Sequence, residues 1–491
     1  MNLSPPPKPK ALSLVETELQ SIEDEMSPRY GLSKTLYNVF KSIDQIPLEK
    51  LAAKYLGEEL KNAKGEERQP TQKEAAVIIT EHFIHTLDIH GHGIAILNGT
   101  LHFYVKDHWH EVTSDEAQRA LGEFAEAVGH KIREARFFRV REMLLQQIMT
   151  VSPMLQRPQG RTIVNFNNGT LHIQLNGEDL FPHDKSNAFT YVLPFAYEPT
   201  VESPMFQQYL DRVLPDTESQ TVLAEFFGWI FLRDLKIEKM LMLYGHGHNG
   251  KSVIFDILTA LLGEENISHL GMDSLKSPES RLPIVGKLLN YGSEVSGTVK
   301  PDIIKKAASG EPLEFRKLYG DLFTTDNYSR LAFNANNLPP DVEHTAGYFR
   351  RFLIIPFEET ITEDEKDPDL ASKIIADELP GVMNWILDGM KRLRSARKFS
   401  PCRKSEQCLN RYQHESDTTA QFIDEDGYEP CMDSRVSKLE LFGRYREYCQ
   451  LNGYKSLGKR KFNERLSTHH RIQGGKHGDI GYFWHLNQPE G

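Results

Sequence analysis

A glycine-rich octapeptide near the middle of the chain limits the possible folds more than any other stretch; it reads Gly245-His246-Gly247-His248-Asn249-Gly250-Lys251-Ser252. It matches the pattern G-x-x-x-x-G-K-[S/T], in which backbone N–H groups surround the phosphates of a nucleotide. An apolar run from Met240 to Tyr244 precedes it, and apolar residues recur at helical spacing after it, up to Gly263. A buried strand, a glycine-rich turn and a helix N-terminus direct several N–H groups toward an anion. The octapeptide therefore predicts an α/β core that binds a nucleoside triphosphate.

Two side chains of the octapeptide have expected roles of their own. Lys251 would reach the β- and γ-phosphates, and Ser252 would bind Mg²⁺. We therefore expect ATP and Mg²⁺ as cofactors. A chance match in a surface loop is the alternative, and the strand before the octapeptide and the helix after it argue against that. The remaining pattern positions, which would line the phosphates, are Gly245, Gly247, Asn249 and Gly250.

At 491 residues, the chain is long enough for two to four domains with substantial cores. No apolar run is long enough to span a bilayer, and the opening Met1–Lys10 is rich in proline and lysine with no apolar signal segment behind it. We therefore expect an intracellular protein without membrane contact.

The chain has four cysteines, Cys402, Cys408, Cys431 and Cys449. They form no C-x-x-C pair, so we expect free thiols and no zinc site built from cysteine.

Charge is distributed unevenly along the chain. The formal net charge is −11, but the segment from Arg435 to Lys476 holds eleven Lys and Arg against three Glu, a net of +8, which leaves −19 for the remainder. An acidic body with one basic terminal segment indicates a local nucleic-acid contact. A solvated basic face is the alternative.

The same terminal segment has the pattern of a small DNA-binding module. Leu439 to Tyr448 has helical spacing, Asn452-Gly453 forms a turn, and the glycine-containing stretch 474–484 can form a β-wing. We predict a winged helix, and packing of a small capping domain is the alternative. The side chains expected to face DNA phosphates are Lys459, Arg460, Lys461 and Arg465.

Seven histidines lie between His82 and His110, which raises the question of a metal site. No cysteine is nearby, and no histidine pair combines with Asp88 or Asp107 in a recognised ligand spacing. Strand alternation around an Asn-Gly turn at 98–99 puts His102 on the outward face of a predicted hairpin. We therefore expect surface histidines rather than a metal centre.

Three features after the octapeptide carry residues that an ATPase needs. A partly apolar run ends in Glu294, a carboxylate that would order Mg²⁺ and polarise the attacking water. A second predicted strand ends before Asn336, whose amide would bond the water and the γ-phosphate; turn formation is the alternative. Arg350 and Arg351 precede a third apolar strand and would supply an arginine finger to a neighbouring subunit, with a surface salt bridge as the alternative.

A fourth feature lies between the acid and the asparagine. The segment Ser309–Gly320 has glycine and proline around mixed basic and aromatic residues, which predicts a hairpin or loop. It would hold Arg316 and Lys317 toward DNA phosphates. A solvated surface hairpin is the alternative.

The order and spacing of these features resemble the superfamily 3 helicase core, specifically the phage and plasmid type that is related to poxvirus and satellite-phage primase-helicases. The resemblance covers Gly93 to Phe399, because neighbouring segments are similar as well: Asn168–Leu171, Leu180–Asp184, Phe226–Gly228 and Gly381–Gly389. The matched residues are the Walker A pair Lys251-Ser252, the Walker B glutamate Glu294, the sensor Asn336, the arginine pair Arg350-Arg351, and a DNA-contacting hairpin near Arg316-Lys317. Ser293 departs from the family pattern, since a second acid there would strengthen Mg²⁺ binding.

The resemblance implies an α/β fold with a P-loop AAA+-like ATPase core, an α+β N-terminal domain and a C-terminal winged helix. The expected segments are 1–70 (extension and linker), 71–215 (pre-helicase domain), 216–400 (ATPase domain) and 401–491 (linker and winged-helix-like domain). It implies an ATP-dependent DNA helicase that acts as a ring, expected to be a hexamer, on single-stranded and forked duplex DNA, with 3′-to-5′ translocation. Such a protein would replicate a phage, plasmid or mobile element in the cytoplasm of a bacterial or phage-infected host cell.

Three alternatives stay open. The chain can be the helicase subunit of a primase-helicase, with a primase or other replication proteins as partners; its first ninety residues show no apolar-flanked Asp-x-Asp pair, so we expect no primase activity here. The second alternative is a P-loop nucleotide kinase. Asn336, the paired arginines and the basic terminal module argue against it, because a kinase would need none of them. A non-enzymatic DNA-binding protein with a relic ATP site is the third alternative, against which the intact lysine, serine, glutamate and asparagine argue.

Overall fold

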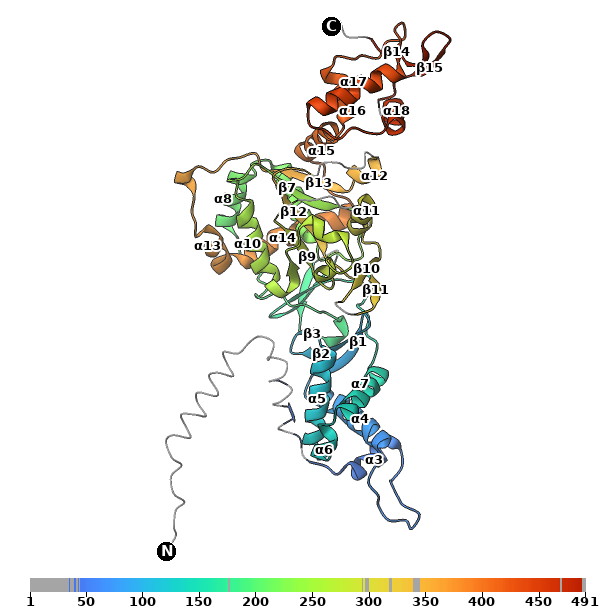
Figure 1. Ribbon diagram of the computed structural model, residues 1–491. Coiled ribbons are helices and arrows are strands. Elements are labelled where there is room, and N and C mark those ends of the chain that lie inside the picture. The colour runs from blue at the N-terminus through green and yellow to red at the C-terminus, as the bar shows by residue number, and fades with distance from the viewer. Residues whose placement is uncertain are drawn as a thin grey trace, which may run out of the picture. The chain divides into compact units, whose positions relative to one another are not determined.

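The computed structural model describes residues 35, 39–40, 43, 45–174, 177–293, 295, 300–317, 320–338, 345–468 and 470–487. The predicted acid Glu294 lies outside them. The chain divides into two compact units, Met1–Tyr197 and Glu198–Gly491 (Figure 1). The segment boundaries predicted at residues 70, 215 and 400 remain predictions.

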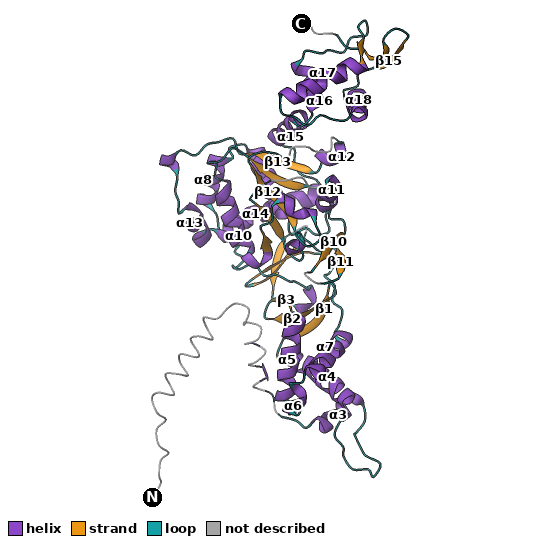
Figure 2. Cartoon of the chain, viewed as in Figure 1, coloured by secondary structure: helices purple, strands orange, loops and turns teal. Residues whose placement is uncertain are grey.

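The first unit combines helices with two three-stranded antiparallel sheets, of strand order β1-β2-β3 and β4-β5-β6 (Figure 2). The strands are β1 Gly93–Leu97, β2 Thr100–Val105, β3 His108–Glu111, β4 Thr162–Phe166, β5 Gly169–Ile173 and β6 Glu178–Phe181. The helices are α3 Leu48–Leu56, α4 Gln72–Ile89, α5 Ser114–Ala127, α6 Ile132–Ala135, α7 Phe138–Val151 and the 3₁₀ turn η2 Lys185–Asn187.

The hairpin predicted around the Asn-Gly turn is present in the first sheet. Leu97 pairs with Thr100, and both turn residues have positive φ, 50° at Asn98 and 82° at Gly99, as a two-residue hairpin turn of the favoured hand requires. The prediction of an outward-facing His102 is wrong, since this side chain is 5% exposed. The sheet is covered on both faces, because Trp109, which projects to the same side, belongs to a second buried cluster.

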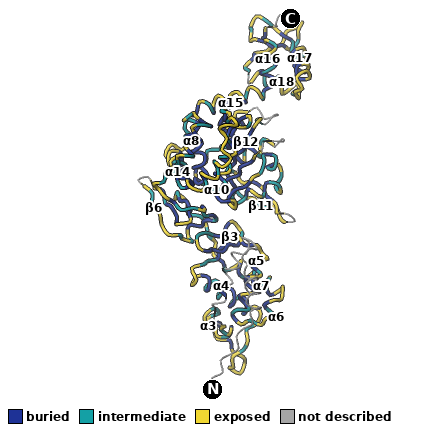
Figure 3. The backbone as a smooth tube through the Cα atoms, turned by 90° about the vertical axis from the view of Figure 1, so that its left-hand side faces the viewer, coloured by how far each residue is buried: buried dark blue, intermediate teal, exposed yellow. Residues whose placement is uncertain are grey.

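The second unit is built on a five-stranded parallel sheet of order β13-β7-β12-β9-β8. The strands are β7 Met240–Tyr244, β8 Ile267–Ser268, β9 Leu289–Gly292, β12 Arg330–Ala335 and β13 Phe352–Pro356. The first four residues of β7 are fully buried, as a strand with neighbours on both faces requires. The neighbouring strand β12 is mostly buried as well, and Figure 3 shows dark blue backbone around its label. The structure thus confirms a mixed α/β fold with a parallel sheet.

Helices and a hairpin surround this sheet. The helices are α8 Pro204–Val213, α9 Thr217–Trp229, α10 Lys251–Leu262, α11 Pro301–Ser309, α12 Ala346–Phe349, α13 Leu370–Asp377, α14 Leu379–Ala396 and α15 Arg403–Glu415, with 3₁₀ turns at Glu264–Asn266, Met272–Lys276, Leu282–Ile284 and Glu363–Glu365. The hairpin pairs β10 Leu313–Arg316 with β11 Leu322–Thr325. Helices α9 and α14 touch closely, since a Cβ on Gly389 would lie 2.4 Å from the backbone of Ala224.

The C-terminal part of the second unit forms a small core of its own. Its elements are α16 Thr418–Glu425, β14 Val436–Ser437, α17 Lys438–Leu451, α18 Lys459–Thr468, β15 Gly474–His477 and β16 Gly481–Trp484, with sheet order β14-β16-β15. The rings of Tyr445 and Phe462 stack with centroids 4.4 Å apart and hold α17 against α18. The two helices and the hairpin expected from the sequence are therefore present. Within the described residues, no helix has the length and apolar character needed to cross a membrane.

Candidate functional site

The glycine-rich octapeptide connects strand β7 to helix α10, as the sequence predicted. The strand ends at Tyr244 and the helix begins at Lys251. Gly250, which caps the helix, has φ of 80°, and Gly247 has φ of 94°, both in the left-handed region that favours glycine. The loop therefore ends at a helix N-terminus whose N–H groups can bind an anion.

Lys251 lies inside the loop rather than in solvent. Its Nζ donates to the Gly245 carbonyl at 2.6 Å and to Asn249 Oδ1 at 3.0 Å, and the residue is 6% exposed. Burial lowers the pKa of the Lys251 ammonium to about 8. Both acceptors are neutral, so a phosphate would be a stronger partner for this ammonium than those it has here. The loop and its lysine thus fit a nucleotide phosphate.

Neighbouring elements hold the loop in shape. Asn249 Nδ2 donates to the Phe357 carbonyl just after β13 at 3.2 Å, and the Tyr209 hydroxyl of α8 donates to the Gly250 carbonyl at 2.6 Å. A Cβ on Gly245 would lie 2.2 Å from Asn249 Nδ2, so no larger residue fits there. The contribution of Tyr209 was not predicted, because no local pattern links it to a loop about forty residues later.

The predicted sensor residue Asn336 lies beside this loop. Strand β12 pairs with β7 in parallel, Ala335 opposite Tyr244, and Gly245 N donates to the Ala335 carbonyl at 3.0 Å. Asn336 follows directly and is exposed. Ser252, at the start of α10, is exposed as well. The structure therefore brings the loop, its serine and the asparagine to one edge of the sheet.

Strand β9 ends near this edge, where the catalytic acid was expected. Gly292 lies opposite Phe333 of β12, and Ser293, which follows, is exposed. Glu294 is outside the described residues, so its position next to the loop stays a prediction.

The two arginines predicted as finger candidates have different surroundings. The side chain of Arg351 is 9% exposed; its guanidinium bonds the Lys305 carbonyl at 3.1 Å, the Gly347 carbonyl and the Ser309 hydroxyl. The side chain of Arg350 is 63% exposed and donates to Glu238 at 2.7 Å. Arg351 thus stabilises the fold, and Arg350 is the arginine that can reach another molecule.

Arg350 lies far from the phosphate loop of its own chain. It is two residues before β13, and the first residue of β13, Phe352, pairs with Met240, the first residue of β7. The loop follows the other end of β7. At about 3.3 Å per residue, the strand separates the two by roughly 15 Å. One chain therefore does not bring its own arginine and its own loop together.

The predicted hairpin is present as strands β10 and β11. Arg316 ends β10, is exposed, and its Nη1 lies 3.3 Å from Glu279 Oε1. Lys317 follows in the connection and is exposed. The buried Phe315 stacks on Phe323 across the hairpin with ring centroids 5.9 Å apart, which fixes the hairpin's inner face.

The four basic residues predicted for the C-terminal module divide into two groups. Lys459, Arg460 and Lys461 are exposed in the first turn of α18. Arg465 is instead paired with the buried Asp417 at 3.0 Å and has a side chain only 14% exposed. Asp417 also caps α16 and bonds His470 at 3.2 Å. Arg465 therefore has a partner within the module.

A cavity of about 280 Å³ adjoins the phosphate loop. It extends from the loop, at His246 and Gly247, past the end of β13 to helix α15. Its wall includes the ion pair between Lys404 and Glu358, 2.7 Å apart, and the buried Cys408. Burial raises the pKa of the Cys408 thiol to about 11.

Family models match three separate parts of the chain. Residues 62–215 are similar to the family described as D5 N terminal like, residues 243–351 to a family of unknown function (DUF5906), and residues 414–484 to the family described as Poxvirus D5 protein-like. The second match spans the phosphate loop, Asn336 and both arginines, and the third spans the basic module.

Solved structures of the NrS-1 C-terminal region are also similar in part. The apo structure and two A-form apo structures of that region are each 12% identical in sequence and have a TM-score of 0.47. They cover 82% of this chain and 97% or 98% of theirs. A likeness of this degree carries no argument about activity.

Proposed function

The chain belongs to the family of phage- and poxvirus-type primase-helicases, and on that premise we propose that it is an ATP-dependent DNA helicase that acts in replication. The second unit is a P-loop ATPase core of AAA+ type, and the chain works as a homo-oligomeric ring, a hexamer. Its substrates are single-stranded DNA and forked duplex DNA, and a primase or another replication protein is its partner.

The observation that carries this proposal is the arrangement at the carboxyl edge of the parallel sheet. Lys251, Ser252 and Asn336 gather there, around a loop with the backbone geometry of a phosphate site. Lys251 would bind the β- and γ-phosphates, Ser252 and Glu294 would hold Mg²⁺, and Asn336 would orient the attacking water. Bound ATP supplies the phosphoanhydride bond whose hydrolysis drives movement.

The position of Arg350 supports a site shared between two subunits. Because the sheet separates it from its own loop, the exposed guanidinium at this end would reach the nucleotide of a neighbouring subunit. If subunits contact head to tail and close into a ring, each subunit contributes its loop to one interface and its arginine to the other. Arg350 is therefore the finger, and Arg351 positions it.

Two basic elements are the proposed DNA contacts. The β10–β11 hairpin holds Arg316 and Lys317 at its tip, where they would follow one strand through the ring. The C-terminal elements have the order of a winged helix, and the exposed first turn of α18 would contact phosphates.

DNA-stimulated ATP hydrolysis and separation of a forked duplex test the proposal, with wild type compared with Lys251→Ala. Both activities should fall at least about a hundredfold in the variant, as when an electrostatic contact to the transition state is removed. Lys391→Ala is the matched control, because this lysine lies on the outer part of α14, beside Asp388. Equal ATP turnover in wild type and Lys251→Ala would exclude this ATPase mechanism.

A further inference from the structure

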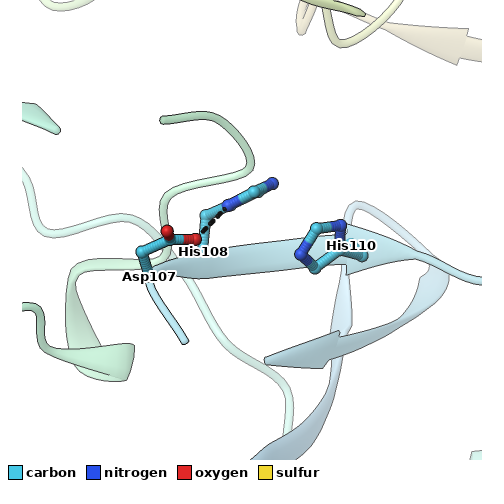
Figure 4. Close-up of side chains that lie close together, drawn as sticks. All are labelled: Asp107, His108 and His110. Carbon is cyan, nitrogen blue, oxygen red and sulfur yellow. Dashed lines mark hydrogen bonds and ion pairs between the residues drawn. The ribbon is translucent and has the colours of Figure 1, made fainter. Parts of the chain in front are cut away.

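Strand β3 of the first unit holds two histidines next to an aspartate. Asp107 precedes the strand, and His108 and His110 lie on it, two residues apart, so strand alternation directs both to the same side. One ligand atom of each of the three side chains lies within 4.8 Å of the others. Figure 4 shows the three side chains along this strand.

The contacts among the three side chains are close. Asp107 Oδ1 lies 2.6 Å from His108 Nδ1, and the two imidazole rings have centroids 3.9 Å apart. All three side chains are partly buried, so the group is neither free in solvent nor closed to it.

We propose that Asp107, His108 and His110 form a binding site for one divalent transition-metal cation, for which Zn²⁺ is the best fit. Two imidazole nitrogens and one carboxylate oxygen suit zinc, whose ligand distances are about 2.0–2.2 Å. The donor set disfavours Mg²⁺ and Ca²⁺, which prefer oxygen ligands. Water would complete the coordination.

Cation binding would replace a proton. Two ligands of a tetrahedral zinc are about 3.3 Å apart, so the 2.6 Å contact between Asp107 and His108 must open by less than 1 Å. As zinc binds to Nδ1 of His108, the proton on that nitrogen moves through solvent to Nε2 of the same ring, so the ring ligates as a neutral imidazole.

The backbone beneath the site is held in place by the second sheet. The fully buried Asn165 of β4 donates from Nδ2 to the Asp107 carbonyl at 2.9 Å and to the Tyr191 carbonyl at 3.0 Å. Its Oδ1 bonds His183 Nδ1 at 3.1 Å. The aspartate is thus attached to a rigid element before any cation binds, which lowers the cost of ordering the site.

A second group of three possible ligands in the described residues contrasts with this one. It consists of Asp216, Glu218 and Cys402. Asp216 Oδ2 accepts from the N–H and the hydroxyl of Ser219, and Glu218 Oε2 accepts from the Arg403 N–H. These two carboxylates accept hydrogen bonds from N–H groups at the starts of helices. Among the hydrogen bonds described, the Asp107 carboxylate accepts none from a backbone N–H.

Zinc binding to the full-length protein tests the proposal. Protein freed of metal by a chelator is titrated with Zn²⁺ alone, in competition with a chromophoric chelator, and zinc content is measured after gel filtration. We expect wild type to take up one equivalent that the double variant His108→Gln/His110→Gln loses or binds at least about tenfold more weakly, since changes even around direct ligands cost ten- to hundredfold. Zn²⁺ should also raise the unfolding temperature of wild type but not of the variant.

Two control variants separate this site from other zinc-binding groups. His90→Gln changes an exposed histidine of the same region, and Cys431→Ser removes the half-exposed thiol. Both variants should still bind one equivalent of Zn²⁺. Asp107→Asn replaces the double variant if that protein does not fold. No uptake by wild type, or equal uptake and equal thermal shift in wild type and ligand variants, would overturn the proposal.

Discussion

Arg351 donates to the Ser309 hydroxyl from Nε at 3.2 Å and from Nη2 at 3.1 Å, which joins the start of β13 to the end of α11. The preceding Arg350 directs its guanidinium outward, to Glu238. Arg351 Nη2 also lies 3.5 Å from the same Glu238 carboxylate, so the two arginines share one acid, and Arg351 in addition bonds groups within the fold.

The first prediction concerns the stability of the two arginine variants. Arg351→Ala leaves buried acceptors without a donor and should cost about 2–3 kcal/mol. Arg350→Ala removes an exposed ion pair and should cost less than about 1 kcal/mol. Urea unfolding of the two proteins measures the difference, and equal midpoints would show that the assignment of the two side chains is wrong.

The second prediction concerns the tight packing of the phosphate loop. Gly245→Ala places a Cβ 2.2 Å from Asn249 Nδ2 and 2.5 Å from the Phe357 carbonyl, so the loop must shift. ATP affinity should fall at least about tenfold, the equivalent of 1.4 kcal/mol. Gly443→Ala is the control, because nothing lies within 4 Å of a Cβ at that position in α17. Unchanged ATP binding by Gly245→Ala, measured by calorimetry, would contradict the geometry.

The third prediction follows from the raised pKa of Cys408, about 11. The thiolate is the reactive form, so native Cys408 should alkylate slowly at pH 8 and faster as pH approaches 11. An unfolded cysteine ionises near pH 8.5, so the unfolded state loses its proton first and stability falls between about pH 8.5 and 11. Peptide mass spectrometry after iodoacetamide treatment measures the rates. Labelling at pH 8 as fast as that of the half-exposed Cys431 would contradict the burial.

The fourth prediction divides the basic residues of the C-terminal module. Joint replacement of Lys459, Arg460 and Lys461 by alanine should weaken DNA binding and lower the slope of log K against log salt by up to about 2–3. Arg465→Ala should instead lower thermal stability, because it leaves the buried Asp417 without its arginine. Fluorescence anisotropy at several salt concentrations tests the first part. An unchanged slope in the triple variant would show that these three side chains do not contact DNA phosphates.

Local chemistry explains which features could be predicted from the sequence. The strand, loop and helix around Lys251 follow from an apolar run, glycines and helical spacing within about twenty residues. The hairpin turn at Asn98-Gly99 is equally local, since only a few residue types accept two positive φ angles. Such features do not depend on contacts with residues that are distant in the sequence.

The remaining features depend on partners distant in sequence. Ser309 distinguishes Arg351 from Arg350, and Asp417 engages Arg465; neither partner follows from local spacing. His108 and His110 were an exception, because an His-x-His pair on a short strand places both rings on one side. The closeness of these two rings could therefore have been predicted from the sequence, and the expectation of surface histidines did not include it.

The central claim is an ATP site shared between neighbouring subunits, and mixing of two inactive proteins tests it most directly. Arg350→Ala subunits keep the loop, and Lys251→Ala subunits keep the finger. In randomly mixed rings at equal ratio, about one quarter of interfaces combine an intact loop with an intact arginine. We predict that DNA-stimulated ATP hydrolysis returns to about that fraction of wild type, whereas each protein alone, or either mixed with the double variant, stays inactive. A mixture that remains as inactive as its components would contradict the shared site.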